Sequence, residues 1–147
     1  MDLLIGEYRN TLDEKGRILF PAKLRSALTE NSLFVTKSLD KCLWLYTSDR
    51  WNELQTKLME NTSSFSERNR RIRRYLLGSA QEVEFDKAGR ISIPQPLREH
   101  AGLVKDCVIV GVGRNIELWD AEAYRKVMDD FEPSLEEAAE ELSELKF

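Results

Sequence analysis

Apolar and polar residues alternate on both sides of a short polar segment near the start of the chain. The alternating apolar positions are Tyr8, Leu12, Ile18 and Phe20. A period of two is typical of half-buried β-strands, because successive side chains point to opposite faces of a sheet. The pattern therefore predicts a β-hairpin with strands at 7–12 and 17–20 and a turn at 13–17.

The turn sequence returns 73 residues later, together with the residues around it. The segment DEKGR from Asp13 to Arg17 corresponds to DKAGR from Asp86 to Arg90. At the same offset the match continues through most of each half, in the pairs Ile18–Ile91, Leu24–Leu97, Arg25–Arg98, Val35–Val108, Leu45–Leu118 and Trp51–Tyr124. A single offset without a gap indicates an internal duplication.

Each copy of the turn combines an aspartate, a glycine and an arginine. The aspartate can accept hydrogen bonds from the turn backbone, and Gly16 or Gly89 can adopt the positive φ that other residues avoid. Asp13 and Arg17 flank the first turn, so they can also form an ion pair of small energy. On physical grounds alone, a turn-stabilising ion pair and a ligand-binding role are equally open.

The two halves are expected to contain the same order of elements, with a proline at the first position of one helix in each half. In the first half these are a helix from Pro21 to 28, strands at 33–36 and 42–46, and a helix capped by Ser48. In the second half they are strands at 80–86 and 90–93, a helix from Pro94 to 101, strands at 107–112 and 115–119, and a helix from Asp120.

An arginine-rich helix is expected to join the halves, and an acidic helix to follow them. The joining helix carries Arg68, Arg70, Arg71, Arg73 and Arg74. Its arginines could contact phosphates, cross a subunit interface or face water. The predicted domains are a first repeat at 1–62, the linking helix at 63–78, a second repeat at 79–132 and an acidic C-terminal helix at 133–147.

The charge of the chain is distributed unevenly. Its net charge is −4, but residues 129–147 carry eight carboxylates and one lysine, so the other residues sum to +3. An acidic tail on a mildly basic body limits indiscriminate phosphate binding and leaves a nucleic-acid partner open. No run approaches 18 apolar residues, so we expect a cytoplasmic protein with no membrane partner.

The residues needed for catalysis or metal binding are sparse. Cys42 and Cys107 are far apart in the sequence, and His100 is the one histidine of the chain. None of the three belongs to a nucleophile, zinc or nucleotide-binding motif, so His100 is expected to be a solvated helix residue and the cysteines to pack. We expect no enzyme activity, no metal or organic cofactor and no small-molecule substrate.

These residues together resemble the MraZ family of bacterial transcriptional regulators, whose chains carry two AbrB/SpoVT-like DNA-binding repeats, each with an Asp-x-x-x-Arg signature. The matching segments occur in the family's order, at 6–8, 11–17, 21–23, 43–46, 86–90 and 111–113. The resemblance implies an α+β fold in which the two repeats form a swapped-hairpin type of β-barrel with flanking helices. It also implies a homo-oligomeric ring, associated with the nucleoid, that binds direct repeats in promoter DNA of the division and cell-wall gene cluster.

The resemblance places the two signatures at Asp13 and Arg17 and at Asp86 and Arg90. The residues expected to contact DNA are Arg9, Lys15, Gly16, Arg17, Lys87 and Arg90. Residues 7–25 carry a net charge of +2 and the equivalent residues 80–98 a net charge of 0. Because phosphates attract positive charge, this comparison predicts that the first hairpin dominates DNA affinity.

Two other classes of function are consistent with the sequence. In the first, the hairpins and the arginine-rich helix form protein interfaces in a structural or interaction protein that binds no operator. In the second, the chain is an antitoxin-like partner of the same fold and binds a toxin through its acidic tail. Binding to upstream DNA and the neighbouring genes would separate these alternatives.

Overall fold

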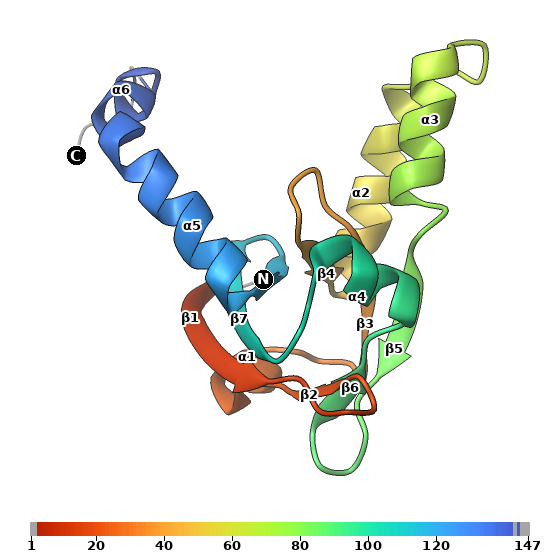
Figure 1. The fold of residues 1–147 in the computed structure, drawn as a ribbon. Coiled ribbons are helices and arrows are strands. Elements are labelled where there is room, and N and C mark those ends of the chain that lie inside the picture. Colours follow the sequence, from red (N-terminus) through yellow and green to blue (C-terminus); the bar gives the residue numbers. More distant parts are fainter. Residues whose placement is uncertain (1–2, 143, 145–147) are drawn as a thin grey trace.

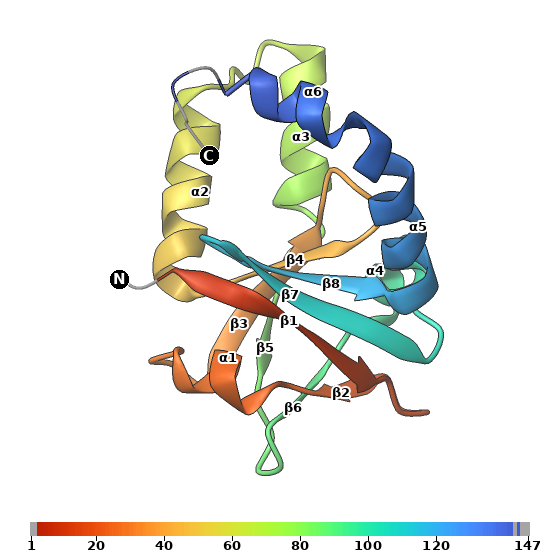
Figure 2. The same cartoon turned by 90° about the vertical axis from the view of Figure 1, so that its left-hand side faces the viewer.

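The computed structural model describes residues 3–142 and 144 of the chain. Its largest element is a six-stranded antiparallel sheet with the order β1-β7-β8-β4-β3-β5 (Figures 1 and 2). The strands are β1 (Leu4–Thr11), β3 (Ser32–Lys37), β4 (Leu43–Tyr46), β5 (Gln81–Glu84), β7 (Asp106–Gly113) and β8 (Ile116–Asp120). Mixed helices and antiparallel strands confirm the expected α+β class at this level.

The two halves exchange strands. The edge strand β1 of the first half pairs with β7 of the second half, and β5 pairs with β3 in the same way. A separate ribbon joins β2 (Arg17–Leu19) to β6 (Arg90–Ser92), with Ile18 opposite Ile91. Antiparallel pairing across the halves therefore holds both edges of the main sheet to the other repeat.

The predicted simple hairpin of strands 7–12 and 17–20 is wrong beyond its turn. One isolated bridge, between Leu12 and Ile18, links the two strands before they separate. Ile18 and Ile91 are completely buried, and each brings its strand against the other half. Strand alternation can show that these residues face a core, but it does not show which strand lies beside them.

In β3 and β7 the two halves correspond at an offset of 74, not 73. Val35 pairs with Leu45, and Ile109 pairs with Leu118. Leu45 and Leu118 are 73 residues apart, so Val35 corresponds to Ile109, and its predicted match with Val108 is wrong. The second half has one more residue before β7 and one fewer in the β7–β8 turn, which keeps the inward positions in register.

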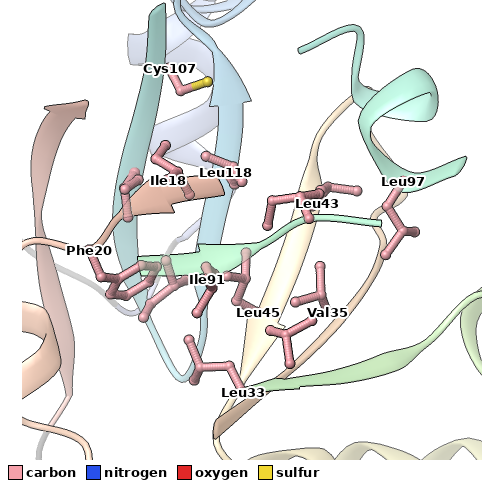
Figure 3. Close-up of a cluster of buried hydrophobic side chains, with 14 of the residues drawn as sticks. Ile18, Phe20, Leu33, Val35, Leu43, Leu45, Ile91, Leu97, Cys107 and Leu118 are labelled. Carbon is pink, nitrogen blue, oxygen red and sulfur yellow. The ribbon is translucent and has the colours of Figure 1, made fainter. Parts of the chain in front are cut away.

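One hydrophobic core serves both halves. It lies between the main sheet and the β2–β6 ribbon, and Figure 3 shows that its side chains come from both repeats. Its most deeply buried members include Ile18, Phe20, Leu33, Val35, Leu43, Leu45, Ile91, Leu97, Ile109 and Leu118. Because these side chains come from both repeats, neither half alone encloses the core. Each of them contributes about 1.5–3 kcal/mol when it is buried.

Two short helices flank the ribbon. They are α1 (Ala22–Ser26) and α4 (Gln95–Ala101), and each begins one residue later than predicted, because Pro21 and Pro94 are N-caps with extended ψ of 133° and 142° and not the first helical residues. Gly102 ends α4 in the left-handed conformation, with φ of 60°. Proline has no N–H to leave unpaired and its φ is already helical, which explains both starts.

Two helical arms extend away from the β2–β6 ribbon (Figure 1). One contains α2 (Ser48–Glu60) and α3 (Glu67–Leu76), and the other α5 (Ala121–Phe131), η1 (Glu132–Ser134) and α6 (Leu135–Glu140). The cap of α2 is Thr47 and not Ser48, because the Thr47 hydroxyl accepts the hydrogen bond from Arg50 N. Among the residues described, no helix combines the length and apolar character needed to cross a membrane.

The arginines of α3 are partly engaged within their own arm. Arg73 binds Thr62 and Ser64, Arg70 binds the Ser64 carbonyl, and Arg71 forms an ion pair with Glu67. The contacts of Arg70 and Arg73 close the connection between α2 and α3, while the Arg71–Glu67 pair lies within α3. Together these contacts give three of the five arginines a structural role that the sequence left open.

Candidate nucleic-acid interface

The first signature turn is built around the carboxylate of Asp13. Its Oδ1 accepts hydrogen bonds from the backbone N–H groups of Lys15 at 2.9 Å and Arg17 at 2.8 Å. Its Oδ2 accepts from Nε of Arg17 at 2.8 Å. Gly16 has φ of 78° and donates its N–H to the Asp13 carbonyl at 3.0 Å. One side chain thus fixes both the turn and the arginine beside it.

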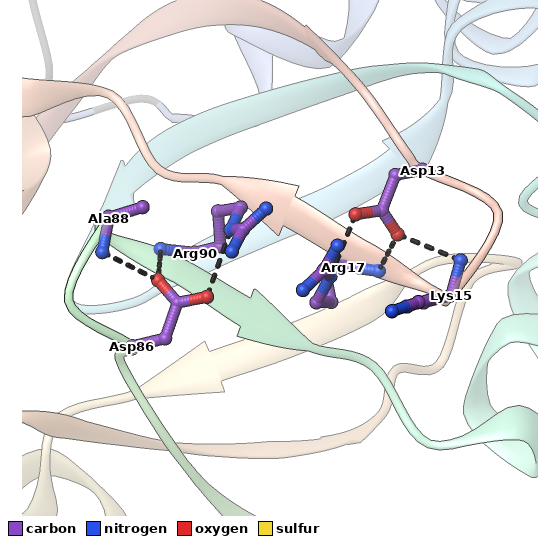
Figure 4. A network of polar contacts seen from close by, with 6 residues as sticks. All are labelled: Asp13, Lys15, Arg17, Asp86, Ala88 and Arg90. Atoms are coloured by element: carbon purple, nitrogen blue, oxygen red, sulfur yellow. Dashed lines mark hydrogen bonds and ion pairs between the residues drawn. The ribbon is translucent and has the colours of Figure 1, made fainter.

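The second turn repeats this arrangement. Asp86 accepts from the N–H groups of Ala88 and Arg90 and from Nε of Arg90, each at 2.9 Å. Figure 4 shows the two networks on the neighbouring strands β2 and β6. Gly89 has φ of 84°, close to the value of its counterpart in the first turn. The two copies of the motif therefore share their backbone geometry as well as their aspartate, glycine and arginine residues.

Both aspartates are held in their charged form. The pKa of Asp13 lies below its usual value mainly because the Arg17 backbone N–H donates to the carboxylate, and the Arg17 side chain adds to the effect. The pKa of Asp86 is lowered in the same way by Arg90. Hydrogen bonds to a carboxylate favour its ionised state, so the turns keep their shape at neutral pH.

Each signature arginine uses one nitrogen to hold its turn. The side chains of Arg17 and Arg90 are 29% and 35% exposed, and their Nε atoms donate to the aspartates. Within residues 3–142, the terminal Nη atoms of these two arginines make no hydrogen bond to another protein group. Each turn therefore contains the expected ion pair between aspartate and arginine. The Nη atoms of each guanidinium stay available to a ligand.

Each turn packs under an arginine from the other half. A Cβ on Gly89 would lie 1.4 Å from Nη1 of Arg25, and a Cβ on Gly16 would lie 2.2 Å from Nη1 of Arg98. Two backbone hydrogen bonds repeat the exchange, from Phe20 N to the Gly89 carbonyl and from Ile93 N to the Gly16 carbonyl. Glycine is needed in both turns for its positive φ and for the space that the arginine occupies.

Arg25 and Arg98 pack on the signature turns and were missed by the prediction of site residues, although the duplication marks them. They are repeat equivalents, each eight positions after a signature arginine. Nε of Arg98 is buried and makes no hydrogen bond to a described residue. These two residues position the turns, and their equivalence across the duplication is visible in the sequence alone.

The predicted contact residues do not form one cluster. Lys15 is exposed on the first turn and Lys87 on the second, whereas Gly16 is buried under Arg98. Arg9 lies on β1 and lines a hollow of about 580 Å³ together with residues of α1 and with Ala88 of the second turn. Arg9 therefore belongs spatially beside the second turn, although it precedes the first in sequence.

This exchange overturns the electrostatic comparison made from the sequence. Segments 7–25 and 80–98 are not surfaces, because α1 lies beside the second turn and α4 beside the first. Grouped as they lie in space, residues 13–17 with α4 carry no net charge, counting histidine as neutral. Residues 86–90 with α1 carry a net charge of +3. The grouping by sequence segment therefore does not describe the charge around each turn, and the dominance of the first hairpin in DNA affinity stays a prediction.

His100 is not simply a solvated helix residue. Its ring packs edge-on against Tyr75 with 5.8 Å between centroids, and Nε2 lies 3.3 Å from the Asp40 carbonyl. Burial lowers the pKa of His100. Cys42 and Cys107 are buried free thiols, and in the part of the chain that the structure describes no cluster of three or more potential metal ligands occurs.

Comparison with known proteins agrees with this architecture. A family model described as "MraZ protein, putative antitoxin-like" matches the chain twice, at residues 3–75 and 76–145. A curated relative from Treponema denticola, named transcriptional regulator MraZ, is 50% identical over 144 residues, which cover 98% of this chain and 100% of the relative. The double match confirms the duplication that the repeated turns indicate. The chain belongs to the MraZ family.

Proposed function

We propose that the chain is a sequence-specific DNA-binding transcriptional regulator and that its two signature turns contact the operator. The observation that carries this proposal is the pair of arginines, Arg17 and Arg90, each of whose guanidinium groups is held by an aspartate through Nε and not through its Nη atoms. The relative from Treponema denticola carries the name of a transcriptional regulator. The proposal extends that role to this chain and assigns it to the β2–β6 ribbon.

The register of the ribbon suits this role. Ile18 and Ile91 face the core, so the alternate residues of both strands face outward. Arg17 is opposite Ser92, which makes Arg90 its diagonal neighbour, and such neighbours are about 7–8 Å apart. That separation is close to two base-pair steps of about 3.4 Å each. An arginine can donate two hydrogen bonds to the O6 and N7 atoms of guanine.

The proposal also includes a swapped-hairpin type of barrel and assembly of the chains into a ring. The crosswise pairing of β1 with β7, β5 with β3 and β2 with β6 supports a swapped-hairpin type of barrel. The arm of α5 and α6 exposes apolar side chains that a neighbouring subunit of a ring could cover, namely Val127, Met128, Phe131, Leu135 and Leu142. We propose a cytoplasmic, nucleoid-associated ring that binds direct repeats upstream of its own gene, in the division and cell-wall cluster.

The test is direct binding to DNA. Fluorescence anisotropy with the DNA upstream of the gene should show specific binding at about 0.15 M salt, where exposed charges are screened beyond about 8 Å, and an unrelated duplex should bind far more weakly. The double variant Arg17→Ala/Arg90→Ala should lose the specific component while its circular dichroism and mass in light scattering stay unchanged. Equal affinity of the unaltered protein for both duplexes would refute sequence-specific recognition.

A second candidate is an antitoxin-like role, which the description of the matching family favours. The acidic arm of α5 and α6, with its exposed apolar residues, would then bind a toxin. The two roles predict different sensitive regions. Substitutions at Phe131 and Leu135 would abolish toxin neutralisation without changing DNA affinity, whereas Arg17→Ala/Arg90→Ala would do the reverse.

A further inference from the structure

Two hollows, one beside each signature turn, have linings of opposite charge, although only Ala22–Gln95 and Arg25–Arg98 of their lining residues are repeat equivalents. The hollow of about 580 Å³ next to the second turn is lined by the cationic side chains of Arg9, Lys23 and Arg25, with no carboxylate among its lining residues. The hollow of about 540 Å³ next to the first turn is lined by the carboxylates of Asp13, Glu14 and Glu99, with Arg98 as its one arginine. The near-symmetric fold thus has one basic and one acidic flank.

The cations of the basic flank are not neutralised inside the protein. In the described part of the chain, Arg9, Lys23, Arg25 and Lys87 form no ion pair, while six other arginines do. Arg9, Lys23 and Lys87 are exposed, so an external anion can reach them. Arg25 is half-buried, and its guanidinium covers Gly89.

The contributing residues come from separate segments. Arg9 lies on β1, Lys23 on α1 and Lys87 in the turn between β5 and β6, and the two halves meet there because Arg25 packs on Gly89. Exposed cations beside an outward-facing arginine suit a phosphate backbone, to which lysine and arginine are the usual ligands.

We infer that Arg9, Lys23 and Lys87 form a phosphate-anchoring surface around the second turn, and that the acidic flank keeps the phosphate backbone away from the first. The inference rests on the proposed function and adds an orientation of the DNA to it. A duplex bound to the ribbon would be held through its phosphate backbone on the side of the second turn only. Phosphate contacts fix orientation without reading sequence. The second turn therefore supplies most of the sequence-independent affinity.

The test compares two charge-matched triple variants. In Arg9→Gln/Lys23→Gln/Lys87→Gln the anchoring cations are removed, and Arg25 is left in place because it packs against Gly89. In Lys41→Gln/Lys57→Gln/Lys126→Gln three exposed lysines elsewhere are removed, so the net charge changes equally. Affinity for the upstream DNA and for an unrelated duplex is measured from about 0.05 to about 0.3 M salt, a range over which phosphate binding weakens steeply.

The first variant should bind both duplexes about tenfold or more weakly, by the same factor for each. The slope of the logarithm of its binding constant against the logarithm of the salt concentration should decrease in magnitude by about 0.9 for each phosphate that the protein no longer neutralises. The second variant should keep the original slope. Unchanged affinity and slope in the first variant, or an equal fall in affinity in the second, would overturn the inference. The unrelated duplex separates the two proposals, since weaker binding there supports the anchoring surface even if upstream DNA is not preferred.

Discussion

The packing of Arg25 on Gly89 predicts a cost for alanine that exceeds ordinary backbone strain. Gly89 has φ of 84°, and an added Cβ would lie 1.4 Å from the guanidinium of Arg25. Gly102 has φ of 60° but no atom within 4 Å of an added Cβ. Gly102→Ala therefore measures the strain alone, whereas Gly89→Ala measures the strain together with displacement of the arginine.

The expected magnitudes follow from these two effects. A residue with a Cβ in the left-handed region costs about 1–2 kcal/mol, and the smaller entropy of unfolded alanine offsets about 0.4–1 kcal/mol of this. Gly102→Ala should thus lower the free energy of unfolding by about 1 kcal/mol. Displacing a flexible guanidinium from its packed site adds about 1–2 kcal/mol, toward the lower part of the range for overpacked sites. Gly89→Ala should therefore cost about 2–3 kcal/mol, or roughly 4–12 °C in Tm.

Double variants identify which arginine is responsible. Urea and thermal unfolding, followed by circular dichroism at one protein concentration, would give the free energy of each variant. In an Arg25→Ala background the extra cost of Gly89→Ala should disappear, because contacting residues are not additive. In an Arg98→Ala background the extra cost should persist. Rescue by both arginine variants, or by neither, would refute the packing of each turn under the opposite half.

Three further predictions concern stability and reactivity. The pKa values of Asp13 and Asp86 are lowered in the folded protein, so the stabilisation that these carboxylates provide is present above their unfolded pKa of about 3.9 and is lost as the pH falls through their folded pKa values. The urea concentration at the unfolding midpoint should therefore decrease when the pH is lowered below about 4. The decrease should be smaller in the double variant Asp13→Asn/Asp86→Asn. Burial raises the pKa of Cys42 to about 12, so this thiol should resist alkylation at about pH 8, near the pKa of a free thiol, until urea unfolds the chain; rapid reaction in the folded protein would contradict its burial. Thr47→Ala should lower the free energy of unfolding by about 1 kcal/mol, as measured by urea titration, and an unchanged free energy would contradict the cap assignment.

Local features of the fold could be predicted from the sequence because local physics determines them. Pro21 and Pro94 mark the starts of two helices to within one residue, since each is the N-cap directly before a helix. The turns at Gly16 and Gly89 have the positive φ that glycine tolerates. Ser66 caps α3 as a hydroxyl before a helix should. Each of these features depends on a few adjacent residues.

Strand partners could not be predicted in the same way. The alternation around Ile18 shows that one face of the strand is buried, yet a hairpin with β1 and a ribbon with β6 both satisfy it. The offset of 74 between Val35 and Ile109 was hidden because Val108, one position earlier, is also buried and apolar. Pairing depends on contacts between residues far apart in sequence, which a single pattern does not record.

The charge of the candidate site depends on the same non-local pairing. A duplication that exchanges its strands places α1 of the first half beside the second turn, so Lys23 and Arg25 lie next to the turn that carries Arg90. Replacements in one repeat thereby change the surroundings of the other turn. Two turns with nearly identical hydrogen bonds can then differ in their electrostatic potential. The local motif determines the backbone geometry of each turn, whereas charged residues of the other half determine much of the potential around it. The chain therefore combines two turns of nearly identical geometry with flanks of unequal charge.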